Sequence, residues 1–363
     1  MADFKDELSP TLVARLAGDI ADVSASFGQA AFVQLAETGL SNLELKARID
    51  WIARALSATM PPSPEDADQV IRAALANGGL EGWASMPVNA YVASAMINSP
   101  DIALPLLAIL TPRYTAEFAI RPFIDAHYDL TMEHLRSWTT HPDEHVRRLV
   151  SEGTRPRLPW AGQLSRFIAD PAPALALLEP SSTTILYVRR SVANHLNDIT
   201  KDHPHLALQV GKRWSLGTTH GDFVVRHGLR TLIKRGDPAA LAILGFDSGA
   251  SIEITNLVCS PSTISIGDST TITFTLHAPD GAKAAIDYLV HYQGARGPKA
   301  GKVFKLTVRD LPAGRAVHFS RQHRFVHVSI RTIHPGPHLI QIQVNGRILG
   351  ETQVDVLPDD SSS

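Results

Sequence analysis

The sequence is poor in cysteine, the residue that disulfide bonds and thiolate metal sites require. Its 363 residues include one cysteine, Cys259, which excludes a disulfide framework or a cysteine-ligated zinc cluster and favours a reducing compartment. The first ten residues, MADFKDELSP, are acidic and polar, unlike a secretory signal. The longest apolar run, around residues 102–110, is too short to span a bilayer. We therefore expect a cytoplasmic protein with no membrane segment.

Common nucleotide-binding and hydrolase motifs are also missing. The sequence has no GxGxxG after a predicted strand, no GxxxxGK[ST], no HExxH and no GxSxG. His141 and His145 lie one helical turn apart, but no third metal ligand is apparent. The sequence therefore predicts neither a metal nor a nucleotide cofactor.

Charge is distributed unevenly along a chain whose formal net charge is −2. Residues 1–112 contain six Lys and Arg against thirteen Asp and Glu, a balance of −7. Residues 113–236 contain seventeen against twelve, or +5, and residues 251–358 contain eleven against seven, or +4. An acidic start followed by two basic segments is typical of a soluble protein that binds a polyanion.

The length favours two domains, and the first 246 residues have a helical pattern throughout. Apolar residues recur at helical spacing, and Pro, Gly, Ser and Asn separate the segments. Early helices are predicted at 12–23, 43–56, 66–75 and 88–97. Related Val-Arg pairs begin at Val146, Val188 and Val225, at intervals of 42 and 37 residues. These intervals predict an all-α HEAT-like repeat solenoid over residues 1–246.

The segment HPDEHVRRLVSEGTRPRLPW, residues 141–160, combines carboxylates, arginines and a tryptophan at one helix and its exit. A helix is predicted over 142–153. Glu144, Arg148 and Glu152 follow one another at a spacing of four and therefore lie along one line of its surface. Such a row can be an ordinary ion-pair row, in which each pair contributes about 0.2–0.5 kcal/mol.

The segment YVRRSVANHLNDIT contains a second polar line formed by Arg190, Asn194 and Asp198. Aligning the two VRR triplets places Arg190 beside Arg148 and Asn194 beside Glu152. Because paired helices of successive repeats lie side by side, two matched polar rows are predicted to face one groove.

Between these helices, prolines stiffen the loop RPRLPWAGQ around Arg155, Arg157 and Trp160. Trp160 is then either a core anchor for the loop or a platform that stacks on a ligand.

After Gly245, the turn-rich segment FDSGAS reads as a linker, and the apolar pattern changes to period two. Seven strands are predicted, at 252–258, 270–276, 285–292, 302–308, 316–331, 337–344 and 351–356. Their number and spacing favour an immunoglobulin-like β-sandwich over 251–358, followed by a disordered tail at 359–363. Arg321 and His323 share a face of the fifth strand and are predicted to contact a nucleic acid; the alternative is a stability or protein-contact module.

The sequences HPDEHVRRLVSEGTRPRLPWA and YVRRSVANHLNDI closely resemble the bacterial AlkC-type DNA alkylation-repair glycosylases, relatives of the HEAT-like AlkD family. The resemblance covers essentially the whole helical region, and some members carry a C-terminal immunoglobulin-like domain. It implies hydrolysis of the N-glycosidic bond of cationic methylated bases in double-stranded DNA, chiefly 3-methyladenine and 3-methylcytosine, without full base flipping. We expect a monomer.

The residues fit this reaction. A methylated cationic base leaves readily, so the enzyme must stabilise an oxocarbenium-like sugar and position a water. Glu152 and Asp198 could do this, with Asp202 as an alternative to Asp198. The resemblance adds Glu117, which we expect in the preceding helix, and Trp160 could stack on the sugar or lesion, gaining roughly 0.5–2 kcal/mol beside a cation. The predicted DNA contacts in this region are Arg148, Arg155, Arg157, Arg189, Arg190 and Asn194.

Two other classes of function stay open. The first is a non-catalytic DNA-structure binding protein, although carboxylates beside phosphates weaken DNA binding and argue against it. The second is a HEAT-type protein scaffold, whose binding would not depend on salt. DNA binding through about five phosphate contacts should instead give a log–log salt slope of roughly −4 to −5.

Overall fold

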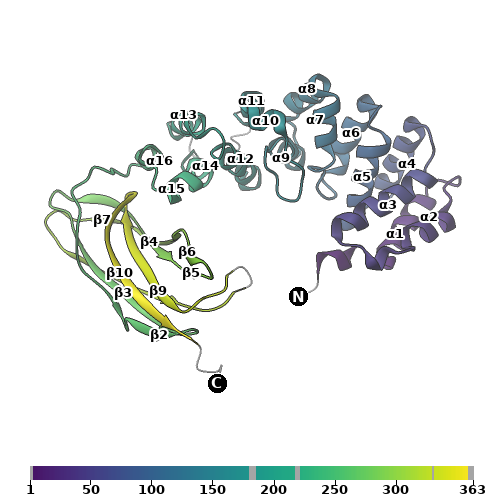
Figure 1. Cartoon of the computed structure of the whole chain (residues 1–363). Helices are drawn as coiled ribbons and strands as arrows, with labels where there is room; N and C mark the ends of the chain where they lie inside the picture. The colour runs from purple at the N-terminus through teal and green to yellow at the C-terminus, as the bar shows by residue number, and fades with distance from the viewer. Residues whose placement is uncertain (1–2, 180–184, 217–220, 329–330, 359–363) are drawn as a thin grey trace. The chain divides into compact units, whose positions relative to one another are not determined.

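The computed structural model describes residues 3–179, 185–216, 221–328 and 331–358. Helices come first and strands follow, as predicted (Figure 1). The tail predicted at 359–363 lies outside the described residues. The chain divides into two compact units, one formed by Met1–His203 with Thr218–Gly228 and the other by Pro204–Gly217 with Leu229–Ser363.

The first unit is built from helices. They are α1 (Pro10–Ala21), α2 (Gln29–Glu37), α3 (Leu45–Thr59), α4 (Pro64–Ala76), α5 (Ser85–Ala95), α6 (Pro100–Leu110), α7 (Ile120–Ala126), α8 (Tyr128–Trp138), α9 (Glu144–Gly153), α10 (Ser165–Ala169), α11 (Ala172–Leu178), α12 (Leu186–Ile199) and α14 (Gly221–Gly228). Three short 3-10 turns accompany them, η1 (Phe4–Glu7), η2 (Leu40–Asn42) and η3 (Gly82–Ala84). The four predicted early helices are α1, α3, α4 and α5, each within a few residues of its predicted ends.

Capping residues and apolar stripes explain these helices. Ser9 and Ser63 cap α1 and α4 by accepting hydrogen bonds from main-chain amides, and each is followed by a proline at the first helical position. The apolar stripes join in one core that runs from Leu8 to Leu177. Among the described residues, no helix is long and apolar enough to cross a membrane.

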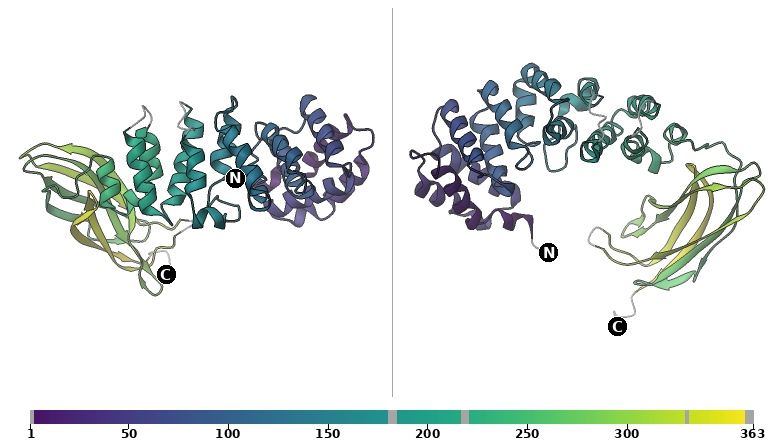
Figure 2. Two further views of the ribbon diagram at one scale, coloured as in Figure 1. Left: turned by 90° about the horizontal axis from the view of Figure 1, so that it is seen from above. Right: turned by 180° about the vertical axis from the view of Figure 1, so that it is seen from behind.

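Helix α9 begins two residues further along the chain than predicted. Asp143 is its N-cap and accepts a hydrogen bond from the amide of His145 at 2.7 Å. The helix ends at Gly153 as predicted. A Cβ at Gly153 would lie 2.5 Å from Ile120 Cγ2, so glycine permits close packing on α7. Helix α12 packs against both α9 and α14, which confirms that the helices carrying the two polar rows are neighbours (Figure 2).

The second unit contains helices α13 (Pro204–Ser215), α15 (Arg230–Lys234) and α16 (Pro238–Ile243), followed by the strands. The strands are β1 (Glu253–Ser260), β2 (Thr263–Ser265), β3 (Ser269–His277), β4 (Ala282–His291), β5 (Gln293–Gly294), β6 (Gly297–Pro298), β7 (Lys302–Leu311), β8 (Val317–Arg324), β9 (Gly336–Val344) and β10 (Arg347–Leu357). The order β1-β3-β8 forms one sheet and β2-β10-β9-β4-β7 the other, while β5 and β6 pair separately. All seven predicted strands are present, although the fifth ends at Arg324.

The inward faces of the two larger sheets share one apolar core, centred on residues such as Phe274, Ile286 and Ile342. Strand β3 alternates buried and half-buried residues along its length, which is the pattern that the sequence showed. The predicted linker FDSGAS is fixed to this unit. Phe246 is buried, and the Asn345 side-chain amide donates to the carbonyl of Asp247 at 2.9 Å.

Candidate active site

Five of the predicted site residues form two ion-paired groups, which we call the carboxylate–arginine cluster. Arg155 lies between two carboxylates, with its Nη1 at 2.5 Å from Glu152 Oε1 and its Nε at 2.8 Å from Asp198 Oδ2. Arg148 Nη1 lies 3.0 Å from Glu117 Oε2. These three carboxylates are buried, and charge-assisted hydrogen bonds to arginine compensate for the water that they lose.

Glu152 is fixed from the neighbouring helix as well. Its Oε2 accepts a hydrogen bond from Ser191 Oγ at 2.6 Å, and Ser191 in turn accepts one from Ser151 Oγ at 2.7 Å. His195 of α12 lies with its Nδ1 at 2.9 Å from the Ser151 carbonyl, which can only accept. Burial lowers the pKa of His195 to about 4, so the ring is neutral at pH 7. Both oxygens of Glu152 therefore have fixed partners, and α9 and α12 are joined by polar contacts.

Glu117 comes from a different place than predicted. It lies in the turn immediately before α7, not within a helix. Arg148 donates to Glu117 and also to Thr115 Oγ1 at 3.1 Å, so the predicted row from Glu144 through Arg148 to Glu152 does not form as an ion-pair row. Burial raises the pKa of Glu117, and the pairing with Arg148 only partly opposes this rise.

The structure distinguishes the two aspartates that the sequence left as alternatives. Asp198 is 2% exposed and is held by Arg155 and by Lys201 Nζ at 3.0 Å. Asp202 forms a two-pronged pair with Arg157, with both N–O distances 2.8 Å, and this pair is open to solvent. Asp198 is therefore the aspartate that Arg155 connects to Glu152.

Arg121 of α7 holds the loop that follows α9, and the sequence pattern did not single it out. Its guanidinium donates to the carbonyls of Gly153, Arg155 and Gly162 at 2.9, 2.8 and 2.5 Å. Burial lowers the pKa of Arg121 to about 10, which leaves it charged at pH 7. The available signal was an arginine among the apolar residues Ile120, Phe123 and Ile124 of this segment.

Trp160 does not anchor the core, because it is 63% exposed. Its backbone has φ +67°, a left-handed conformation that is rare for a side chain of this size. The carbonyl of Trp160 accepts a hydrogen bond from Lys46 Nζ at 2.5 Å, and the ring of Phe4 lies edge-on at 6.3 Å. The loop therefore presents the indole at the surface.

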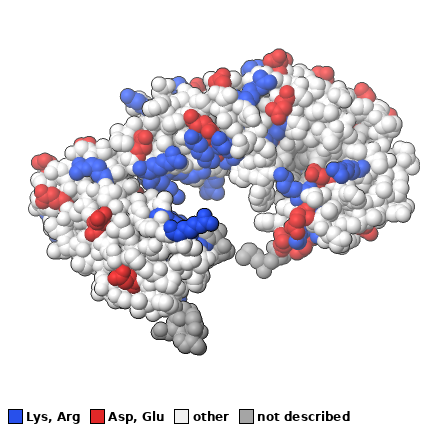
Figure 3. All heavy atoms as spheres, in the orientation of Figure 1, with Lys and Arg blue, Asp and Glu red and all other residues white. Residues whose placement is uncertain are grey.

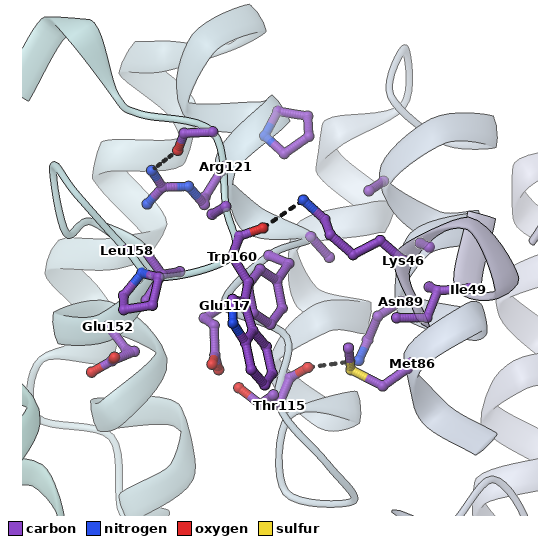
Figure 4. A pocket seen from close by; sticks show the side chains of 18 of the residues that line it. Lys46, Ile49, Met86, Asn89, Thr115, Glu117, Arg121, Glu152, Leu158 and Trp160 are labelled. Atoms are coloured by element: carbon purple, nitrogen blue, oxygen red, sulfur yellow. Dashed lines mark hydrogen bonds between the residues drawn. The ribbon is translucent and has the colours of Figure 1, made fainter. Parts of the chain in front are cut away.

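A cavity of about 920 Å³ lies beside this loop, and its lining includes Glu117, Glu152, Arg155 and Trp160 but not Asp198. In the view of Figure 4, the Trp160 indole lies next to Glu117. Charged side chains of both signs lie around a hollow in the helical part (Figure 3). Two buried carboxylates and an exposed indole at one cavity can stabilise a developing positive charge and stack on a ring.

The other predicted DNA contacts of the first unit differ in accessibility. Arg190 is exposed, whereas Arg189 is half-buried with its guanidinium 5.8 Å from the centre of the Phe223 ring. Asn194 is half-buried, and its Oδ1 lies 3.0 Å from Nε2 of His227. Arg190 is thus the most accessible of the three.

Strand β8 carries the two residues of the sandwich that were predicted to contact DNA. Arg321 and His323 do share a face, but it is the inner face, on which His323 is 6% exposed. The two ring nitrogens of His323 lie 3.0 and 2.8 Å from the hydroxyls of Tyr288 and Tyr292. Burial lowers the pKa of His323 to about 4. The prediction that His323 contacts DNA therefore does not fit its position, whereas Arg321 is exposed.

The fold and this cluster define a class of protein, a HEAT-like helical repeat with buried carboxylates at a cavity, followed by an immunoglobulin-like sandwich. Residues 253–358 match the family described as "Uncharacterised protein YhaZ, C-terminal Ig-like domain". The chain is 33% identical over 350 residues to the uncharacterized protein YhaZ of Bacillus subtilis, covering 96% of this chain and 98% of that one.

A solved structure of Pseudomonas fluorescens alkylpurine DNA glycosylase AlkC, bound to DNA containing an abasic site analog, is similar over nearly the full length. It shares 34% identity and a TM-score of 0.91, covering 98% of this chain and 100% of that one. The chain belongs to this AlkC-type family with a C-terminal immunoglobulin-like domain, as its motifs indicated.

Proposed function

We propose that this protein is a DNA glycosylase that hydrolyses the N-glycosidic bond of cationic alkylated bases in double-stranded DNA. We further propose 3-methyladenine and 3-methylcytosine as its substrates, removed by a monomer without full base flipping and without a cofactor. The observation that carries this proposal is that Glu117 and Glu152, each fixed by an arginine, line one cavity. The similarity to an alkylpurine DNA glycosylase supports the same conclusion.

The reaction needs stabilisation of the sugar more than activation of the base. When the glycosidic bond breaks, its electron pair passes to the cationic base, which leaves neutral, and the positive charge moves to the sugar. We assign the stabilisation of this charge to the Glu152 carboxylate, because Arg155 and Ser191 fix it in position before the substrate arrives. Water then adds to the sugar carbon and loses a proton.

Glu117 is the candidate acceptor of that proton. A carboxylate whose pKa is raised is a stronger base, and burial raises the pKa of Glu117. Arg148 holds the Glu117 carboxylate at 3.0 Å and limits its rotation. Trp160, exposed at the same cavity, would stack on the lesion or its sugar.

We assign DNA binding to arginines of each unit whose side chains are exposed or half-buried. Arg190 and Arg321 are exposed, and Arg148 and Arg157 keep part of their side chains open to solvent. Contacts from these side chains to phosphates would set the register of the DNA without reading its sequence. The interspersed carboxylates weaken such binding, which is why a catalytic reading is preferred over DNA binding alone.

The test is release of bases from methylated DNA by the purified protein. Wild type should release 3-methyladenine without added metal, and Glu152→Gln should lower the single-turnover rate by about 10²–10³-fold. Its DNA affinity should be unchanged or improved, because a negative charge near phosphates is removed. Glu144→Gln is the matched control, since it lies in the first turn of the same helix and should keep the full rate.

Two outcomes would change this assignment. Full activity of Glu152→Gln would remove α9 from the mechanism. A wild-type protein that binds DNA but releases no alkylated base would favour the DNA-structure binding alternative.

A further inference from the structure

Helix α12 carries a second row of side chains that contact α9, in addition to the predicted polar row. Tyr187, Ser191 and His195 follow one another at a spacing of four and therefore lie along one line of the helix. Ser191 donates to Glu152, and His195 contacts the carbonyl of Ser151. Tyr187, at the start of this row, contacts an earlier part of α9.

The ring of Tyr187 contacts two side chains of α9. The guanidinium carbon of Arg148 lies over the ring, 5.2 Å from its centre, and the ring of His145 meets it edge-on with 5.3 Å between the two centres. The negative face of an aromatic ring attracts a guanidinium at this distance. Burial raises the pKa of the Tyr187 phenol, so at pH 7 the ring is a neutral aromatic surface.

The same guanidinium is held by the turn before α7. Arg148 Nη1 donates to Thr115 Oγ1 at 3.1 Å and to Glu117 Oε2 at 3.0 Å. Polar atoms therefore hold the edge of the guanidinium, while the Tyr187 ring covers its face. Glu117 lines the cavity, whereas Arg148 and Tyr187 do not. Tyr187 thus lies one step behind the cavity, and Arg148 connects it to Glu117.

We propose that Tyr187 is a positioning residue of the reaction, whose ring holds the Arg148 guanidinium against the Glu117 carboxylate. Glu117 can take the proton of the attacking water only as a carboxylate, and an adjacent guanidinium favours that form. The role in the reaction rests on the proposed function, whereas the contact between ring and guanidinium does not.

The groups around Glu117 show why the position of Arg148 matters. Burial raises the pKa of Glu117, Arg148 lowers it, and the charge of Glu152 on the same helix as Arg148 raises it. Burial also raises the pKa of Tyr114 and of Tyr187, so these two phenols are neutral at pH 7. Arg148 is therefore the group that opposes burial, and a guanidinium that turns away should let Glu117 take up a proton at higher pH.

The first arm of the test needs no catalysis. The full-length protein is labelled with ¹³C at the glutamate carboxyl carbons, and the signal of Glu117 is assigned by its loss in Glu117→Gln. In Tyr187→Leu, the midpoint of the Glu117 titration should move to higher pH by about one unit. Tyr187→Phe keeps the ring face and should keep the wild-type midpoint. Leu186→Ala, at an exposed neighbouring position, is the matched control and should keep it as well.

The second arm measures single-turnover release of 3-methyladenine over a range of pH. Tyr187→Leu should lower the rate at pH 7 by about ten-fold, because Arg148 and Glu117 are no longer held in place. The fall in rate on the acidic side should begin at higher pH, by the same amount as the Glu117 midpoint moves. Tyr187→Phe and Leu186→Ala should follow the wild-type profile. Tyr187 is 42% exposed, so circular dichroism should show that both of its variants fold.

The outcomes separate this proposal from the proposed function. An unchanged Glu117 midpoint in folded Tyr187→Leu would overturn the proposal, as would an equal shift in Tyr187→Phe. A lower rate with no movement of the acidic side of the profile would overturn it too, because a loss of packing alone explains such a result. A shifted midpoint in Tyr187→Leu, with no base release by wild type, would support the contact and count against the glycosylase function alone.

Discussion

The helical unit and the sandwich both bury polar side chains, but they bury different kinds. Glu152, Arg155 and Asp198 are charged groups that lie at or next to a cavity. In the sandwich, His323 is neutral at pH 7 and lies between the hydroxyls of two tyrosines. Burying charge is far more costly than burying a neutral group whose hydrogen bonds are satisfied. Under the proposed function the charged cluster takes part in catalysis, whereas packing and the two tyrosine hydroxyls account for the buried histidine of the sandwich.

The largest effect that would sharpen this comparison is expected from Arg155→Met. It leaves Glu152 and Asp198 buried without their shared cation, and we expect a loss of about 3–5 kcal/mol in the free energy of unfolding. Arg157→Met is the control, because water screens its exposed pair with Asp202 and the free energy of unfolding should change little. Urea unfolding measures both. Equal stability of Arg155→Met and wild type would show that the buried carboxylates do not need the charge of Arg155.

The sandwich is expected to respond to pH through His323. Burial lowers the pKa of this imidazole to about 4 in the folded protein, against an ordinary value of 6.5, so the unfolded chain takes up a proton first as pH falls. Stability should therefore be independent of this group above pH 6.5 and should fall between pH 6.5 and 4, by up to roughly 3 kcal/mol.

His323→Phe tests this expectation by urea unfolding at a series of pH values. The variant should show a shallower loss of stability below pH 6.5, while His195, with a similarly low pKa, maintains part of the slope. His318→Phe, at an exposed position of the same strand, should behave as wild type. An unchanged slope in His323→Phe would mean that the sandwich cluster does not resist protonation.

The smallest effects are expected on the rate of base release, when either of the two aspartates is replaced by asparagine. Asp198→Asn should slow base release by up to about 100-fold, because Arg155 would no longer be held in place beside Glu152. Asp202→Asn should leave the rate nearly unchanged, since exposed ion pairs contribute only about 0–1 kcal/mol. Single-turnover kinetics distinguish them, and the reverse order of effects would make Asp202 the relevant carboxylate.

Local sequence patterns were sufficient for the elements and for part of the site. The sequence predicted a helix over 142–153, and α9 forms there and ends at Gly153. Period-two runs identified seven strands. The repeated VRR triplets placed α12 next to α9. These inferences succeed because periodicity reports which face of an element is buried, and repeats report which elements are neighbours.

The partners of the charged groups depended on tertiary structure. Spacing along α9 suggested Glu144 or Glu152 as the partner of Arg148, yet packing brings it to Glu117 from the turn before α7. The alternation in β8 placed Arg321 and His323 on one face, but only the opposite sheet determines that this face is the inner one. Asn89 and Arg121 bond to main-chain carbonyls of distant segments, which leave no pattern in the sequence.

The sequence by itself thus determined the two kinds of domain, the helix α9 and its polar residues, and the family. Tertiary structure decided which carboxylate each arginine holds, and that Trp160 stands at a cavity while His323 lies in a core. The physical reason is that side-chain spacing fixes neighbours only within one element. The distances between elements, and therefore burial and ion pairing, are set by the packing of the whole unit.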